Sequence, residues 1–224
     1  MFSVIFEFRP GARKKDDYLA LAQRLRPILQ TMDGFVENER FESVTRPGWL
    51  LSHSSWRDEK ALVRWRTQAM HHGVQEKGRT QTFRDYRLRV GQVTRDTRLP
   101  AGHTLHEQRL DETETGDATT IVLIDARRDA EWLKQAGARE VAGELGLRED
   151  AAGLAAWDVF DAVLTPGDVI LLTAWRDAQA ADAFAGTLAL PEGARLRSVR
   201  VVRDYGMFDR REAPQYYPDA ARHE

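Results

Sequence analysis

The side chains best suited to chemistry lie in the first hundred residues of the 224-residue chain. Trp65 and the adjacent His71 and His72 share one stretch with helical spacing, and Tyr86 follows it. A histidine can accept a proton near neutral pH, whereas an indole or a phenol can donate a hydrogen bond or stack on a flat ring. We therefore predict Trp65, His71 or His72, and Tyr86 as catalytic residues. Each could instead be structural, since aromatic side chains commonly fill cores.

The position of His72 favours it over His71 if the helix is continuous. A residue seven positions after Trp65 returns to within about 20° of the same helix face, and that residue is His72. On the preceding strands, His53 and Asn38 are predicted to contact a substrate. His53 faces the opposite side of its strand from Trp56, and the sequence leaves open whether that side is a pocket or the interior.

Other functional motifs are weak. His103 and His106 have no third metal ligand nearby, and the chain has no cysteine, no glycine-rich phosphate loop and no Gly-x-Ser-x-Gly elbow. We therefore predict neither a metal nor a cofactor.

The sequence that must form the elements positioning these residues occurs twice in the chain, as an internal repeat. Residues 34–65 match residues 153–184 at a constant offset of 119, with nine identical positions. A second block, 87–96 against 195–204, matches at six of ten positions with an offset of 108, so the second copy lacks eleven residues between the blocks. The first copy alone therefore keeps the histidine-containing stretch. It also has Ser-His-Ser-Ser at 52–55 where the second copy has Leu-Leu-Thr-Ala, so we expect a ligand site only in residues 1–96.

Each copy predicts the same order of elements. A strand rich in β-branched residues is followed by a helix, a hairpin with a Pro-Gly turn, a second helix and a final strand. The first helix, 14–32, contains Pro27, which predicts a kink or an early end. Asp58 and its repeat partner Asp177 are predicted to cap the second helix of each copy. In the second copy the first helix is predicted from about Ala130 to Leu145.

This order is β-α-β-β-α-β, the ferredoxin-like arrangement, and the fold class is α+β. We place the first unit at 1–96, a polar linker at 97–118, the second unit at 119–206 and a tail at 207–224. A four-stranded sheet with helices on one face needs a cover for the other. The two units can cover each other sheet to sheet, which predicts an α/β barrel closed within one chain.

Composition excludes several kinds of partner. With 33 basic and 35 acidic residues, the net charge of −2 provides no field for nucleic acid. The absence of cysteine fits a reducing compartment, and the sequence suggests no signal peptide and no apolar run of the roughly 20 residues that span a bilayer. We expect a cytoplasmic protein with a small-molecule substrate and no membrane partner, either a monomer or a homodimer of fused units.

The chain resembles the antibiotic biosynthesis monooxygenase family of dimeric α/β-barrel proteins. The resemblance rests on the Pro-Gly turn, the stretch "SSWRDEKALVRW", the histidine-containing helix and "FRDYRLRV". It implies an apolar pocket between helices and sheet, where an electron-rich anion passes an electron to dioxygen without metal or flavin. It also implies His71 as the pocket histidine, because relatives commonly break the helix just before that position. Gln75 stands where haem-degrading relatives have a ligating histidine, so haem degradation is disfavoured.

Two hypotheses follow from this resemblance. The first is a cofactor-independent monooxygenase acting on a small aromatic or quinol-like substrate in the first unit. The alternative is a non-catalytic protein that binds or senses haem, a quinone or a lipid-like molecule in the same pocket.

Overall fold

The computed structural model describes residues 1–106, 109 and 114–210. The tail predicted at 207–224 falls outside the described residues beyond Arg210, and part of the linker predicted at 97–118 does so too. The first unit contains β1 (Phe2–Pro10), α1 (Lys15–Thr31), β2 (Phe35–Ser43), β3 (Leu50–Trp56), α2 (Glu59–Thr67), α3 (Ala69–Lys77), a π-helical turn η1 (Gly78–Thr82) and β4 (Phe83–Asp96). The second contains β5 (Thr120–Arg127), α4 (Ala130–Gln135), α5 (Ala138–Glu144), β6 (Leu154–Ala162), β7 (Asp168–Trp175), α6 (Ala178–Thr187) and β8 (Arg195–Gly206).

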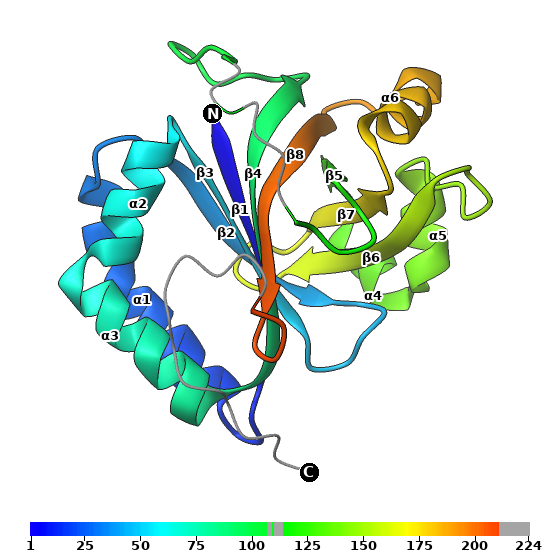
Figure 1. The fold of residues 1–224 in the computed structure, drawn as a ribbon. Helices are drawn as coiled ribbons and strands as arrows, with labels where there is room; N and C mark the ends of the chain where they lie inside the picture. Colours follow the sequence, from blue (N-terminus) through cyan, green and yellow to red (C-terminus); the bar gives the residue numbers. More distant parts are fainter. Residues whose placement is uncertain (107–108, 110–113, 211–224) are drawn as a thin grey trace.

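The strands form one closed antiparallel barrel in the order β1-β3-β2-β6-β7-β5-β8-β4. Each unit contributes a ferredoxin-like sheet, β4-β1-β3-β2 or β8-β5-β7-β6, and the two sheets join edge to edge where β2 pairs with β6 and β4 pairs with β8. Helices α1 to α3 cover one outer side of the barrel and α4 to α6 cover the other (Figure 1). The predicted α+β fold and intrachain barrel are therefore confirmed.

Local sequence signals account for the turns and helix starts. Pro47 and Gly48 occupy the centre of a turn closed by a 3.0 Å hydrogen bond from Trp49 N to Arg46 O, with Gly48 at φ +81°. Only a residue that tolerates positive φ fits the second central position of a type II turn. The second copy repeats this geometry around Pro166 and Gly167. Asp58 and Asp177 each cap a helix, because the side chain accepts a hydrogen bond from the backbone N–H three residues later.

Two helix predictions need correction. Of the two outcomes predicted for Pro27, the early end does not occur: helix α1 continues to Thr31, because Leu25 and Leu29 on either side of the proline are buried in one cluster. The helix predicted from about Ala130 to Leu145 is two helices, α4 and α5. Gly137 is extended at the break, with ψ 156°, and glycine is a poor helix former.

The core has layers on both sides of the barrel wall. Inside the barrel lies a cluster shared by both units, with Ile5 and Leu51 from the first and Phe160 and Ile170 from the second. Outside it, each unit packs its helices on its own sheet. No helix of the described residues is long and apolar enough to cross a membrane.

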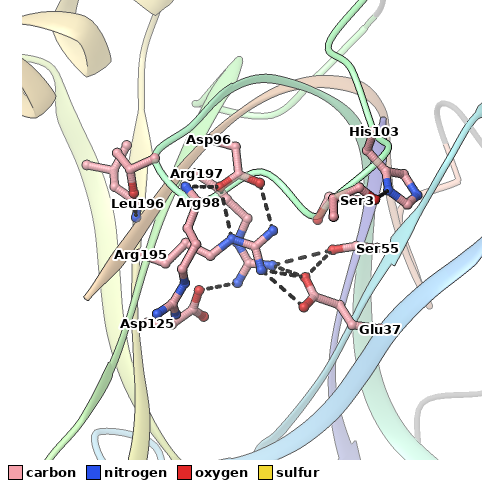
Figure 2. Close-up of polar contacts among 12 residues, drawn as sticks. Ser3, Glu37, Ser55, Asp96, Arg98, His103, Asp125, Arg195, Leu196 and Arg197 are labelled. Atoms are coloured by element: carbon pink, nitrogen blue, oxygen red, sulfur yellow. Dashed lines mark hydrogen bonds and ion pairs between the residues drawn. The ribbon is translucent and has the colours of Figure 1, made fainter. Parts of the chain in front are cut away.

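Polar contacts also link the two units. Asp158 of β6 accepts hydrogen bonds from Ser43 at 2.8 Å and from Arg46 at 2.7 Å. Across the barrel, Glu37 accepts from Arg195 and Arg197, and further donors of these arginines reach Asp96 and Asp125 (Figure 2). These buried arginines are therefore paired with carboxylates, as buried charges require.

Candidate active site

A cavity of about 240 Å³ lies between the helices and the sheet of the first unit, and we call it the first-unit cavity. Its apolar wall comes mainly from α1, α2 and the middle strands. Among its lining residues are Val4, Phe6, Tyr18, Leu21, Ala22, Leu25, Asn38, Arg40, Ser52, Ser54, Leu62, Trp65, Arg66, His71, Val74, Gln75, Arg79, Tyr86, Leu88 and Arg203. Trp65, His71, Tyr86 and Asn38, all predicted from the sequence, thus meet around one space.

A break in the helix decides which histidine reaches this cavity. Helix α2 ends at Thr67, and Gln68 is extended with φ −60° and ψ 127°. The Gln68 side chain then caps α3 by accepting a hydrogen bond from His71 N at 2.9 Å. The break rotates α3 so that His71 lines the cavity while His72 is exposed, which corrects the choice based on a continuous helix.

His71 has a defined orientation. Its ring stacks on Trp65 with centroids 4.1 Å apart and planes 14° apart. Its Nδ1 lies 2.9 Å from the Trp65 carbonyl oxygen and 3.2 Å from the side-chain amide nitrogen of Gln75. The carbonyl is the nearer partner and can only accept, so we assign the proton to Nδ1. Burial lowers the pKa of His71 from 6.5 to about 4, although the hydrogen bond to the Trp65 carbonyl opposes this shift. The ring is therefore neutral at pH 7, with Nε2 as an acceptor.

Trp65 differs from the two tryptophans that recur in the repeat. Trp56 donates its indole N–H to Ser54 at 3.0 Å, and Trp175 donates to Thr173 at 2.8 Å. The Trp65 indole lines the cavity and has no hydrogen-bond acceptor in the described part of the chain. Trp56 and Trp175 thus use their donors in packing, whereas Trp65 keeps a donor available.

Tyr86 is held by two cations at the β4 end of the cavity. Its hydroxyl oxygen accepts hydrogen bonds from Arg79 and Arg210, each at 3.0 Å. The hydroxyl is the acceptor in both contacts, so the proton of the Tyr86 O–H is left to donate.

His53 and Asn38 lie differently from each other. Asn38 lines the cavity and donates to Ser52 Oγ at 3.3 Å and to the His53 carbonyl at 2.9 Å. His53 lies on the other face of β3, in the barrel, where its Nε2 is 2.8 Å from Ser3 Oγ. Strand alternation therefore keeps its side chain out of the first-unit cavity. Burial, with Arg197 and Arg195 nearby, holds the pKa of His53 well below 6.5.

A second hollow, of about 390 Å³, is lined by His53, Glu37, Asp125, Arg195 and Arg197 among others. Arg195 and Arg197 are engaged by the carboxylates of Figure 2, so these two are not available to a ligand. Near the linker, His106 lies 2.7 Å from Thr104 Oγ1, and no group of three potential metal ligands occurs among the described residues.

The positive charge of the first-unit cavity was not predicted from the sequence. Its lining includes the five arginines Arg40, Arg66, Arg79, Arg203 and Arg210, and one carboxylate, Glu59. Glu59 is already paired with Arg109 at 3.0 Å. A signal was present, because Arg40 and Asn38 alternate on one strand face where the repeat has Val159 and Trp157.

Comparisons with known proteins agree on one family. Residues 1–77 match the family model described as antibiotic biosynthesis monooxygenase. The chain is also 48% identical over 226 residues to the jasmonate monooxygenase ABM of Pyricularia oryzae (strain 70-15), and the match covers 99% of this chain and 100% of the relative.

Solved structures with a similar fold are more distant. A monooxygenase candidate from Lactobacillus acidophilus NCFM is 10% identical, with 91% of this chain and 94% of that chain covered and a TM-score of 0.40. An anthrone oxidase-like protein is 15% identical, with 92% of each chain covered and a TM-score of 0.35.

Proposed function

The chain belongs to the antibiotic biosynthesis monooxygenase family, and from that premise we propose that it is a monooxygenase whose substrate binds in the first-unit cavity. The observation that carries this proposal is the end-to-end match to a relative named as a monooxygenase. The stacked pair of Trp65 and His71 on an otherwise largely apolar wall supports the location.

The first candidate substrate is a jasmonate, because that is the substrate in the name of the relative. The second is the small aromatic or quinol-like class expected from the sequence, which the stacked Trp65 indole would also accommodate. The two candidates differ in electron balance. Oxidation of an anthrone CH₂ to a carbonyl by O₂ releases one water and needs no other reductant, whereas hydroxylation of a jasmonate requires two further electrons from an external donor.

Three side chains would share the work. The neutral His71 would accept a substrate proton at Nε2, since Nδ1 is fixed on the Trp65 carbonyl. Trp65 would stack on the substrate or donate its N–H to a developing oxyanion, and Tyr86 would donate from the other end. His72 and His53 take no part in this scheme, because neither lines the first-unit cavity.

Isotope incorporation tests the proposal. The purified protein is incubated under ¹⁸O₂ with jasmonic acid, a hydroquinone and an anthrone, each with and without an external reductant, while oxygen uptake and product mass are recorded. We expect one ¹⁸O atom in the product of at least one substrate. Trp65→Phe, which installs the residue of the second unit, should reduce the rate at least tenfold.

Phe184→Leu is the matched control, because Phe184 occupies the repeat position of Trp65 in the second unit. It should retain the activity of the wild type. A ligand that binds tightly without any oxygen uptake would instead establish the non-catalytic alternative. A homodimer of fused units is a separate expectation, which light scattering of the purified protein would test.

A further inference from the structure

We propose that Tyr18, Arg40 and Ser52 form a carboxylate-binding subsite in the first-unit cavity, so that the substrate is an apolar molecule bearing a carboxylate. This inference rests on the proposed function, because it concerns the same cavity. It goes further by assigning the residues that would select a carboxylate, a group that a jasmonate carries and that a hydroquinone or an anthrone lacks.

The sheet register places these polar groups together at one edge of the cavity floor. Arg40 of β2 lies opposite Ser52 of β3, followed across the sheet by Phe6 of β1 and Leu88 of β4. Side chains directly opposite each other on one sheet face are near neighbours. The floor is therefore polar at the β2–β3 edge and apolar in its middle.

The guanidinium of Arg40 lacks a carboxylate partner in the described part of the chain. Its Nε donates to the Tyr18 hydroxyl at 3.3 Å. The two nearest acidic residues along β2 are engaged elsewhere: Glu42 pairs with Lys15 at 2.6 Å, and Glu39 accepts hydrogen bonds from the Arg40 backbone N–H and from Thr165. Both Nη groups of Arg40 are thus available for an anion.

The neighbouring hydroxyls are arranged as donors too. Tyr18 accepts from Arg40, and Ser52 accepts from Asn38 at 3.3 Å, so each hydroxyl keeps its own proton to donate. Neither O–H has an acceptor among the described residues. Guanidinium and hydroxyl donors without acceptors form a site complementary to a carboxylate.

The second unit shows that the fold does not require these residues. The positions equivalent to Arg40 and Ser52 are Val159 and Leu171, both fully buried in an apolar cluster. A charged residue on the helix-facing side of a sheet is costly unless it is partnered. A bound carboxylate would supply that partner, and Leu21, Leu25 and Leu62 would contact the hydrocarbon part.

The test compares jasmonic acid with its methyl ester, which removes the charge and adds one methyl group. Binding is measured by calorimetry and turnover by ¹⁸O₂ incorporation, in the wild type, Arg40→Gln and Arg40→Lys. The wild type should bind the acid more tightly than the ester. Arg40→Gln should weaken binding of the acid about 10- to 100-fold and that of the ester less than about threefold, with Arg40→Lys between them.

Arg24→Gln provides the matched control, because it removes the same charge from the exposed face of α1. It should change neither affinity. If the wild type binds the acid and ester equally, or Arg40→Gln weakens both equally, the subsite is wrong even if oxidation occurs. If the acid binds in an Arg40-dependent manner but no substrate is oxidised, the subsite stands and the proposed monooxygenase function fails. If neither compound binds, the subsite is wrong.

Discussion

The two units of the barrel share their backbone plan and differ in what lies between helices and sheet. In the first unit, Asn38, Arg40 and Ser52 leave a cavity with unpaired donors. In the second unit, Trp157, Val159 and Leu171 occupy the equivalent positions and pack with the helices. The comparison indicates that one copy can give up its cavity to strengthen the fold while the other keeps a cavity at a cost in packing.

The helices of the two units also differ, and again only the first unit keeps the elements that surround a cavity. The first unit has α3, whose His71 stacks on Trp65, whereas the second passes from α6 to β8 without such a helix. At the position equivalent to Trp65, Phe184 stacks directly on Trp175 with centroids 4.6 Å apart. The eleven residues that the second copy lacks therefore fall in the segment that contains α3 and η1, which line the first-unit cavity, rather than in the barrel strands.

The largest expected effect concerns α3. His71→Gln should lower kcat with the best substrate by about 100-fold or more, because a general base typically contributes a factor of 10² to 10⁴. His72→Gln, one residue away but exposed, should stay within about twofold of the wild type. Steady-state oxygen uptake measures both, and equal losses in the two variants would remove His71 from the mechanism.

A reciprocal exchange between the units should give opposite effects on stability. Leu171→Ser should lower the free energy of unfolding by about 4 kcal/mol, because it leaves a hole and buries a hydroxyl in an apolar cluster. Ser52→Leu should change stability by less than about 1 kcal/mol, because the added carbons enter an existing cavity. Denaturant melts quantify both, and a large loss in Ser52→Leu would argue that the cavity is already filled.

Acid sensitivity should be concentrated in the first unit, which contains the buried histidines. The pKa of His71 is about 4 in the folded protein against about 6.5 unfolded, so its stabilising contribution is complete above pH 6.5 and is lost as the pH falls towards 4. At pH 5 the loss is about 2 kcal/mol. Unfolding at pH 7 and pH 5 should therefore show a smaller difference in His71→Gln than in the wild type, and an unchanged difference would contradict the shift.

The smallest effects should be equal in the two units. Asp58→Ala and Asp177→Ala each remove the N-cap hydrogen bond of a helix, at 2.7 and 2.8 Å, and each should cost about 1 kcal/mol. Thermal melts of the two variants should agree to within about 0.5 kcal/mol. A clear difference between the two stability losses would show that the units differ in their backbone elements as well as in the side chains between helices and sheet.

Much of the frame could be predicted because it depends on local signals. The Pro-Gly turns, the aspartate caps and the alternating strands act through neighbouring residues, and the repeat displayed each of them twice. The positions of breaks within helices were predicted less well. The break at Gly137 was not predicted, and the break at Gln68 was implied only by the family resemblance, since helical spacing alone does not show where tertiary contacts interrupt a helix.

The sequence by itself determined the order of the elements, the duplication and the unit that retained polar side chains, because these are properties of the chain and its nearest neighbours. Only the tertiary structure decided that His71 and not His72 faces the cavity, that His53 lies inside the barrel and that Arg40 meets Tyr18 beside Ser52. Those facts depend on segments far apart in the sequence being brought together, and on which side chains are already paired once they meet.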